Sequence, residues 1–321
     1  MKAQKGFTLV ELLVALVLGL IITATALLLF LTGQKSYSMQ QGTADLQDNA
    51  NFGLSFITQG VRLANLNNPK ALVNDELEQG GVVLAQSNFN ERVATIPLAL
   101  LSASAGDTVG QDHQWGGLSN AAAPANATTL VRSDQLVIQY SAQTNGRDCE
   151  GNAYVPGRVV IERYFLRVDE NSDAREGNAL ALVCDAGQYV SGATNIVDPN
   201  VDADPPVSGT GYGSAGQILM KRVDYFRVLL GVEDLAGNKR YIGIREYRNF
   251  EGVKPRIVSV SLGVLARSTQ PVGEDAVISP NQIFDVLDQR VRIHSNGNPR
   301  GYVRQVITQE IALRNGLGVR N

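Results

Sequence analysis

Histidine, cysteine and tryptophan are scarce in this chain of 321 residues, which has two histidines, two cysteines and one tryptophan. His113 and His294 lie in loop-like surroundings, and neither belongs to an HExxH motif or to a carboxylate cluster with helical spacing. The paired glycines near residues 80 and 212 lack the strand before and the helix after that a nucleotide-binding loop requires. The sequence therefore contains no catalytic constellation, and we expect a protein that is not an enzyme.

An excess of positive charge is also missing. The chain has 28 lysines and arginines against 31 aspartates and glutamates, a net charge of −3, and no long basic run. Such a surface cannot neutralise a row of phosphates, so a dedicated nucleic-acid partner is not expected.

The two cysteines, Cys149 and Cys184, lie well apart and lack the close spacing and the nearby histidines of zinc and redox motifs. In an exported domain they would form one disulfide, because an oxidising compartment favours the bond. The alternative is two free buried thiols. A disulfide that closes a loop of this length would stabilise the fold by about 3 to 4 kcal/mol.

The first 31 residues differ in composition from the rest. Lys2 and Lys5 precede an apolar run over residues 7–31, in which Glu11 is the one ionisable side chain. A helix of about 20 apolar residues spans about 30 Å, the hydrocarbon thickness of a bilayer. The preceding lysines place the N-terminus in the cytoplasm and the remaining chain on the opposite side of the membrane.

Two simpler interpretations of this run are a secretory signal and a plain membrane anchor. The Ala-Thr-Ala sequence at 24–26 has the small residues of a signal cleavage site, but cleavage there would leave a mature chain that begins with exposed leucines. A plain anchor explains neither Glu11 nor the abrupt step from Gly6 to Phe7.

Glu11 needs a partner, because a carboxylate in an apolar segment is costly. If the chain is cut after Gly6, the new ammonium group of Phe7 lies about one helical turn before Glu11. The two charges can neutralise each other within one subunit or between neighbouring subunits. In a helical assembly, the second arrangement would also fix the axial offset of adjacent helices.

The helical period continues beyond residue 31, with apolar residues at steps of three and four. These residues are Leu46, Ala50, Gly53, Leu54, Ile57, Val61 and Ala64. They predict an amphipathic helix over residues 32–66 that continues the apolar helix of residues 7–31, with Gly33 and Gly42 as points where the helix could bend. The alternative is a short linker followed by a separate domain helix.

Residues 67–321 show strand patterns separated by clusters of Gly, Asp, Asn and Pro. The predicted strands cover residues 81–86, 94–101, 135–142, 158–168, 179–184, 217–232, 240–246, 256–265 and 302–313. We therefore expect an α+β fold in which a long N-terminal helical spine packs on a large, mainly antiparallel β-sheet domain.

The sequence KGFTLVELLV at positions 5–14 resembles the processing site of type IV prepilins and of type II secretion pseudopilins. The resemblance implies that residues 1–6 are a leader peptide. It also implies that a prepilin peptidase cuts between Gly6 and Phe7 and methylates the new amino group of Phe7. The mature net charge would then be −5, because two lysines are lost from a chain whose net charge is −3.

Further sequence pieces resemble the PilW family of minor pilins. They are SDQLVIQY at 133–140, DCEG at 148–151, YF at 164–165, LVC at 182–184 and IALRN at 311–315. This resemblance implies a disulfide between Cys149 and Cys184 and a pilin-like fold. It further implies a role at or near the pilus tip, where minor pilins prime assembly in support of twitching motility, adhesion or DNA uptake.

The expected partners and location follow from the same resemblance. The partners are the other minor pilins, the major pilin, the prepilin peptidase, the inner-membrane assembly machinery and a tip adhesin. The chain would cross the bacterial inner membrane once, with its C-terminal domain in the periplasm, and would then move into the fibre at the cell surface.

No cofactor is expected, and calcium is the one candidate ion. Oxygen-bearing side chains recur at Asp198, Asn200, Asp202 and Asp204, but Ala203 stands where an EF-type loop needs glycine and Gly209 where it needs a bidentate glutamate. The competing interpretation is a solvated loop. A second, weaker version consists of Asp169, Asn171 and Asp173.

Three other functions stay open at this point. A type II secretion pseudopilin has the same N-terminus. A tip adhesin or binding module would use the segment 187–215 to contact a surface or ligand. A membrane-anchored periplasmic enzyme is disfavoured, because it would need a catalytic constellation.

Overall fold

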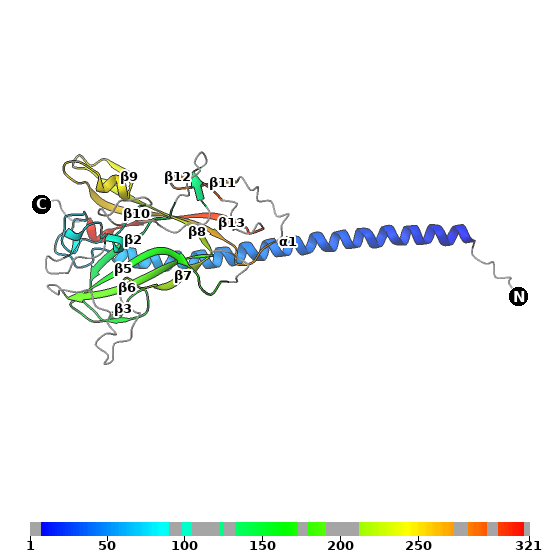
Figure 1. Ribbon diagram of the computed structural model, residues 1–321, viewed down its shortest axis with the longest axis horizontal. Coiled ribbons are helices and arrows are strands. Elements are labelled where there is room, and N and C mark those ends of the chain that lie inside the picture. Colours follow the sequence, from blue (N-terminus) through cyan, green and yellow to red (C-terminus); the bar gives the residue numbers. More distant parts are fainter. Residues whose placement is uncertain are drawn as a thin grey trace.

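The structure is a computed structural model, and it describes residues 8–89, 98–104, 122–124, 132–172, 179–190, 212–272, 282–293 and 301–317. Its dominant element is helix α1, which runs without a break through 55 residues from Leu9 to Leu63. At 1.5 Å per residue this helix is about 80 Å long. Figure 1 shows that its N-terminal half projects from the domain, whereas its C-terminal half lies among the strands.

The projecting half of α1 is exposed along its whole length. Residues 9–41 are all exposed, and among them Leu9 and Leu29 have 79% and 75% of their surface accessible. By length and composition, this part of the helix can cross a membrane. So many large apolar side chains are unfavourable in water, which indicates that lipid or other helices cover them.

The C-terminal half of α1 buries one face against the domain. The buried residues are Gly42, Leu46, Ala50, Gly53, Leu54, Ile57, Thr58, Gly60 and Val61. Their spacing of three and four residues is the apolar stripe that the sequence predicts, with Gly42, Thr58 and Gly60 buried in addition. The stripe therefore attaches the spine to the domain.

The end of α1 is held by a residue from the far end of the chain. The Asn315 side chain donates hydrogen bonds to the carbonyls of Arg62 (3.0 Å) and Ala64 (3.1 Å). Asn65 follows in the left-handed conformation, with φ 63°, and its side chain donates to the Asn315 carbonyl at 3.0 Å. The two bonds from Asn315 satisfy carbonyl groups that the end of the helix leaves unpaired.

Two four-stranded antiparallel sheets form the bulk of the domain. One has the order β2-β5-β6-β7, with β2 at Leu136–Ser141, β5 at Arg158–Val168, β6 at Leu180–Val190 and β7 at Gln217–Lys221. The other has the order β13-β10-β8-β9, with β8 at Val223–Glu233, β9 at Lys239–Gly243, β10 at Arg256–Arg267 and β13 at Arg304–Ala312.

Smaller elements complete the described part of the chain. A three-stranded sheet joins β1 (Ala122–Pro124), β12 (Gln289–Ile293) and β11 (Ile283–Val286), and a two-stranded sheet joins β3 (Gly146–Arg147) and β4 (Ala153–Tyr154). The short helices are η1 (Gln86–Asn88), η2 (Leu98–Leu100), α2 (Ile244–Arg248) and η4 (Arg314–Gly316).

The main core lies between α1 and both large sheets. It combines α1 residues such as Ile57 with β5, β6, β8 and β10 residues such as Leu182 and Leu262. The opposite face of the first sheet has its own cluster, in which Val83 and Leu101 pack on Ile161. The predicted α+β architecture is thus confirmed: a long helix on a mainly antiparallel β domain.

Several predicted strands are wrong in detail. The run 217–232 divides at Arg222, where φ is 60° and the chain passes from one large sheet to the other. Residues 244–246, predicted as strand, belong to α2, and residues 98–100 form η2. Residues 81–86 contribute an isolated bridge at Val82, not a strand.

Candidate functional site

The start of α1 carries Glu11, the residue on which the predicted charge pairing depends. Thr8 is the N-cap of the helix, and its side chain accepts a hydrogen bond from the N–H of Glu11 at 3.3 Å. In return, Oε2 of Glu11 accepts from the Thr8 N–H at 3.0 Å and from the Thr8 hydroxyl at 2.9 Å. This reciprocal pair is a capping box.

The sequence argument missed the role of Thr8. The signal was present, because Thr followed three residues later by Glu, before an apolar run, is the capping-box pattern. Glu11 therefore has a local partner in the single chain. Its second oxygen, Oε1, accepts no hydrogen bond from a described residue, and it is left for a further donor.

Gly6 and Phe7 lie outside the described residues. Cleavage between them and the pairing of the Phe7 ammonium with Glu11 consequently stay predictions. The capping box is compatible with that pairing, because it uses one carboxylate oxygen of Glu11 and leaves the other.

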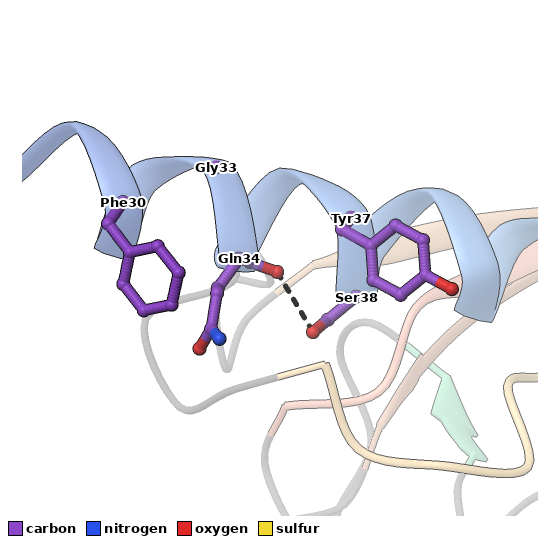
Figure 2. A pocket seen from close by; sticks show the side chains of 5 residues that line it. All are labelled: Phe30, Gly33, Gln34, Tyr37 and Ser38. Atoms are coloured by element: carbon purple, nitrogen blue, oxygen red, sulfur yellow. Dashed lines mark hydrogen bonds between the residues drawn. The ribbon is translucent and has the colours of Figure 1, made fainter.

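A shallow hollow lies on α1 between the apolar half and the domain. Phe30, Gly33, Gln34, Tyr37 and Ser38 line it, and Figure 2 shows Gly33 between the two aromatic rings along the helix. The Ser38 hydroxyl donates to the Gln34 carbonyl at 3.0 Å, an ordinary bond within the helix. None of these five lining residues carries a carboxylate or an amine.

The polar residues of the segment 133–140 tie the two large sheets together. The buried carboxylate of Asp134 accepts from Arg227 Nη1 at 3.0 Å and from the Val228 N–H at 2.8 Å. The Ser133 hydroxyl accepts from the Phe226 N–H at 3.0 Å. These contacts join the start of β2 to β8, and their role is architectural.

A buried polar cluster lies under α1 on the first sheet. Glu162 on β5 is 3% exposed, and its carboxylate accepts from the hydroxyls of Tyr164 (2.6 Å) and Tyr140 (3.3 Å) and from the Cys149 N–H (3.1 Å). The helix passes over this carboxylate at Gly60, where an added Cβ would lie 2.5 Å from Oε2 of Glu162. Glycine is thus required for the close approach of helix and sheet.

The expected disulfide is present beside Glu162. Cys149 and Cys184 are joined, which links the β3–β4 region to β6. The two sulfurs and the Glu162 carboxylate lie within 4.8 Å of one another, a spacing that could hold a metal ion. Since the sulfurs are bonded to each other, they are not available as thiolate ligands.

The buried carboxyl of Glu162 makes stability depend on pH. Burial raises its pKa from the ordinary 4.5 to about 7, and the nearby charge of Asp148 acts in the same direction, against the hydrogen bonds from Tyr164 and Tyr140. Between these two values the folded state keeps a proton that the unfolded state has released. The contribution of Glu162 to the free energy of unfolding is therefore fully present below pH 4.5. It is lost as the pH rises to about 7, because the folded state must then hold a buried charge.

We expect Glu162→Gln to remove this dependence. Relative to the wild type, the variant should gain about 3 kcal/mol of unfolding free energy as the pH rises through that interval. Urea unfolding of the detergent-solubilised chain across the interval measures the difference. Glu246→Gln, at a carboxylate with 55% of its side chain exposed, is the control. If the free energy of unfolding changed with pH in the same way in the wild type and in Glu162→Gln, Glu162 would not be the source of the pH dependence.

The calcium candidates Asp198, Asn200, Asp202 and Asp204 lie outside the described residues, so this hypothesis stays a prediction. Of the weaker set, Asp173 lies outside as well, but Asp169 is described. Its carboxylate is buried and bonded to Arg222 at 2.7 Å.

The Asp169 carboxylate also accepts from the Asn171 N–H at 3.1 Å. A carboxylate that is already neutralised by an arginine and closes a turn is a poor calcium ligand. The weaker candidate set is therefore disfavoured by the structure.

Two family models match the chain. Residues 1–27 match the prokaryotic N-terminal methylation motif, and residues 186–315 match the type IV pilus-assembly protein W family, PilW. Together these matches support a type IV pilus minor pilin of the PilW family. The first match contains Gly6, Phe7 and Glu11, and the second extends from β6 to η4, including Asn315 at the end of α1.

Comparisons with curated proteins and with solved structures add little to these matches. No curated protein matches it significantly. Among solved structures, a type IV-like pilin from Thermus thermophilus is similar at 14% identity and a TM-score of 0.36, with 84% of this chain and 96% of that chain covered. A TM-score of this size carries no argument about the domain.

The disulfide lies outside both matched regions, because Cys149 and Cys184 follow residue 27 and precede residue 186. Its presence is therefore known from the structure. The methylation motif and the exposed apolar half of α1 together fit a membrane-anchored pilin.

Proposed function

We propose that this minor pilin is processed between Gly6 and Phe7 and enters a type IV pilus at or near its tip, where it primes assembly. The observation that carries the proposal is the start of α1. There, a methylation motif precedes a fully exposed apolar helix whose one carboxylate, Glu11, keeps an oxygen for a further donor. Such a helix is suited to lipid first and to a bundle of similar helices afterwards.

Size supports a place at the tip. Residues 67–321 form a domain of about 250 residues, which is large for one subunit repeated along a shaft. At the end of a fibre, such a domain meets fewer neighbours. The partners are the other minor pilins, the major pilin and a tip adhesin, and the peptidase and inner-membrane machinery act before assembly.

The location of the chain changes during assembly. The chain crosses the bacterial inner membrane once, with its domain in the periplasm, and is then extracted into the fibre. The disulfide is consistent with an oxidising compartment.

Deletion of the gene tests the proposal. We expect surface fibres to be lost or strongly reduced and to return with the wild-type gene, while type II secretion continues. Antibody labelling of an epitope-tagged chain should mark fibre ends. Normal fibres with a loss of secretion would instead indicate a pseudopilin, and labelling along the whole shaft would contradict the tip position.

A further inference from the structure

Two of the four outer strands of the large sheets are covered by other parts of the chain. The edge of β2 is bonded to residues 81–83, through Val83 N–H to the Val137 carbonyl (2.9 Å) and Gln139 N–H to the Gly81 carbonyl (3.0 Å). The edge of β7 is capped by Asn49 of α1. Its side-chain amide donates to the Lys221 carbonyl at 2.7 Å and accepts from the Lys221 N–H at 3.2 Å.

A third outer strand, β9, is short and charged. It has five residues, begins with the exposed Lys239 and Arg240, and passes directly into α2. Short length and charged side chains are the usual means by which an edge strand avoids pairing with another chain.

The fourth outer strand, β13, is longer, no other described segment is bonded along its outer edge, and its two charged residues, Arg304 and Glu310, lie toward its ends. It pairs with β10 over nine residues without a bulge, and its sequence, RQVITQEIA, contains neither lysine nor proline. Gln305, Thr308, Glu310 and Ala312 are exposed. The strand lies beside α1 (Figure 1), and Ile307 and Ile311 belong to the core below it.

The outer backbone of β13 is unoccupied in the described part of the molecule. Its backbone bonds to β10 and, at the Glu310 carbonyl, to the Gln309 side chain at 3.2 Å. Apart from the Glu310 carbonyl, alternate N–H and carbonyl groups of β13 therefore face outward with no hydrogen-bond partner among the described residues. Such a row of donors and acceptors is complementary to one kind of ligand, an extended polypeptide backbone.

We propose that the free edge of β13 is a strand-addition site, which pairs with an extended segment of a neighbouring subunit in the same fibre. This inference rests on the proposed function, because it takes its partner from the assembly. The edge lies beside α1, so a subunit seated against the helix lies within reach of it. The exposed Gln305 and Thr308 are uncharged, which favours a polar, uncharged segment as the partner.

Photo-crosslinking in assembled fibres tests the proposal directly. A photoreactive residue is placed at Gln305 or at Gln309 in the full-length chain, and the attached partner peptide is identified by mass spectrometry. We expect both positions to link to one segment of another subunit. The two linked sites should be about four residues apart, because Gln305 and Gln309 are four residues apart and paired strands have the same rise per residue. The matched control is Val253, which is 71% exposed on a loop and should give no such link.

A pair of edge lysines provides the second test. Gln305→Lys with Thr308→Lys should lower recovery in fibres several-fold relative to the membrane pool, because lysines on an edge disfavour strand pairing. Gln305→Asn with Thr308→Ser should behave as wild type. Equal recovery of the lysine variant, or links only to a second copy of this chain, would overturn the proposal. If wild-type chain were absent from fibres, the proposed function itself would fail.

Discussion

Glu11→Ala is expected to leave the chain inserted in the membrane and to lower its recovery in sheared fibres on the order of tenfold, because the ammonium of a processed neighbour would then be buried without its counter-charge. Removal of a charged side chain does not oppose insertion of an apolar helix. The measurement is the ratio of fibre-bound to membrane-bound chain on immunoblots.

The capping box requires a control, because Glu11 also bonds to Thr8. Glu11→Gln keeps an acceptor for the cap but has no charge. If charge pairing drives incorporation, the glutamine variant should fail as the alanine variant does. If the cap alone matters, Glu11→Gln would assemble normally, and the pairing argument would be wrong.

Loss of the disulfide has the second large expected effect. Replacing Cys149 and Cys184 together by alanine should lower the unfolding free energy by about 3 to 4 kcal/mol, because the unfolded chain regains the freedom of the closed loop. The bond lies in the core beside Glu162, so the β3–β4 region should loosen first. Urea unfolding of the detergent-solubilised chain measures the change.

A reduced wild-type chain is the matched control for the double alanine variant. Both should unfold at similar urea concentrations. These concentrations should be lower than the one that unfolds the oxidised wild-type chain. Unchanged stability in the variant would mean that the packing of β3 and β4 holds this region without the covalent link.

The helical spine could be predicted from local sequence patterns, whereas cleavage after Gly6 and the pairing of Glu11 stay predictions. The step from Gly6 to Phe7 and the lone Glu11 lie within ten residues of each other, and the stripe from Leu46 to Val61 repeats at helical spacing. Helical contacts are short in sequence, so a single window contains the evidence. The same applies to Arg158–Val168, where the strand has the predicted bounds.

Features that depend on distant partners could not be predicted. Nothing local indicates that Glu162 would lie under Gly60, or that Asn315 would cap a helix that ends some 250 positions earlier. The division at Arg222 depends on its buried pair with Asp169 and on the change of sheet. Strands β11 and β12 were missed because they are short and lie among loop-forming residues.

Mass spectrometry of the N-terminal peptide, taken from chains in purified fibres, tests the central claim most directly. We predict a peptide that begins at a methylated Phe7, without residues 1–6, and a Gly6→Val chain that keeps its leader and stays in the membrane. A fibre-bound chain that still begins with Met1 would contradict the account, because Glu11 would then have no processed amine to pair with.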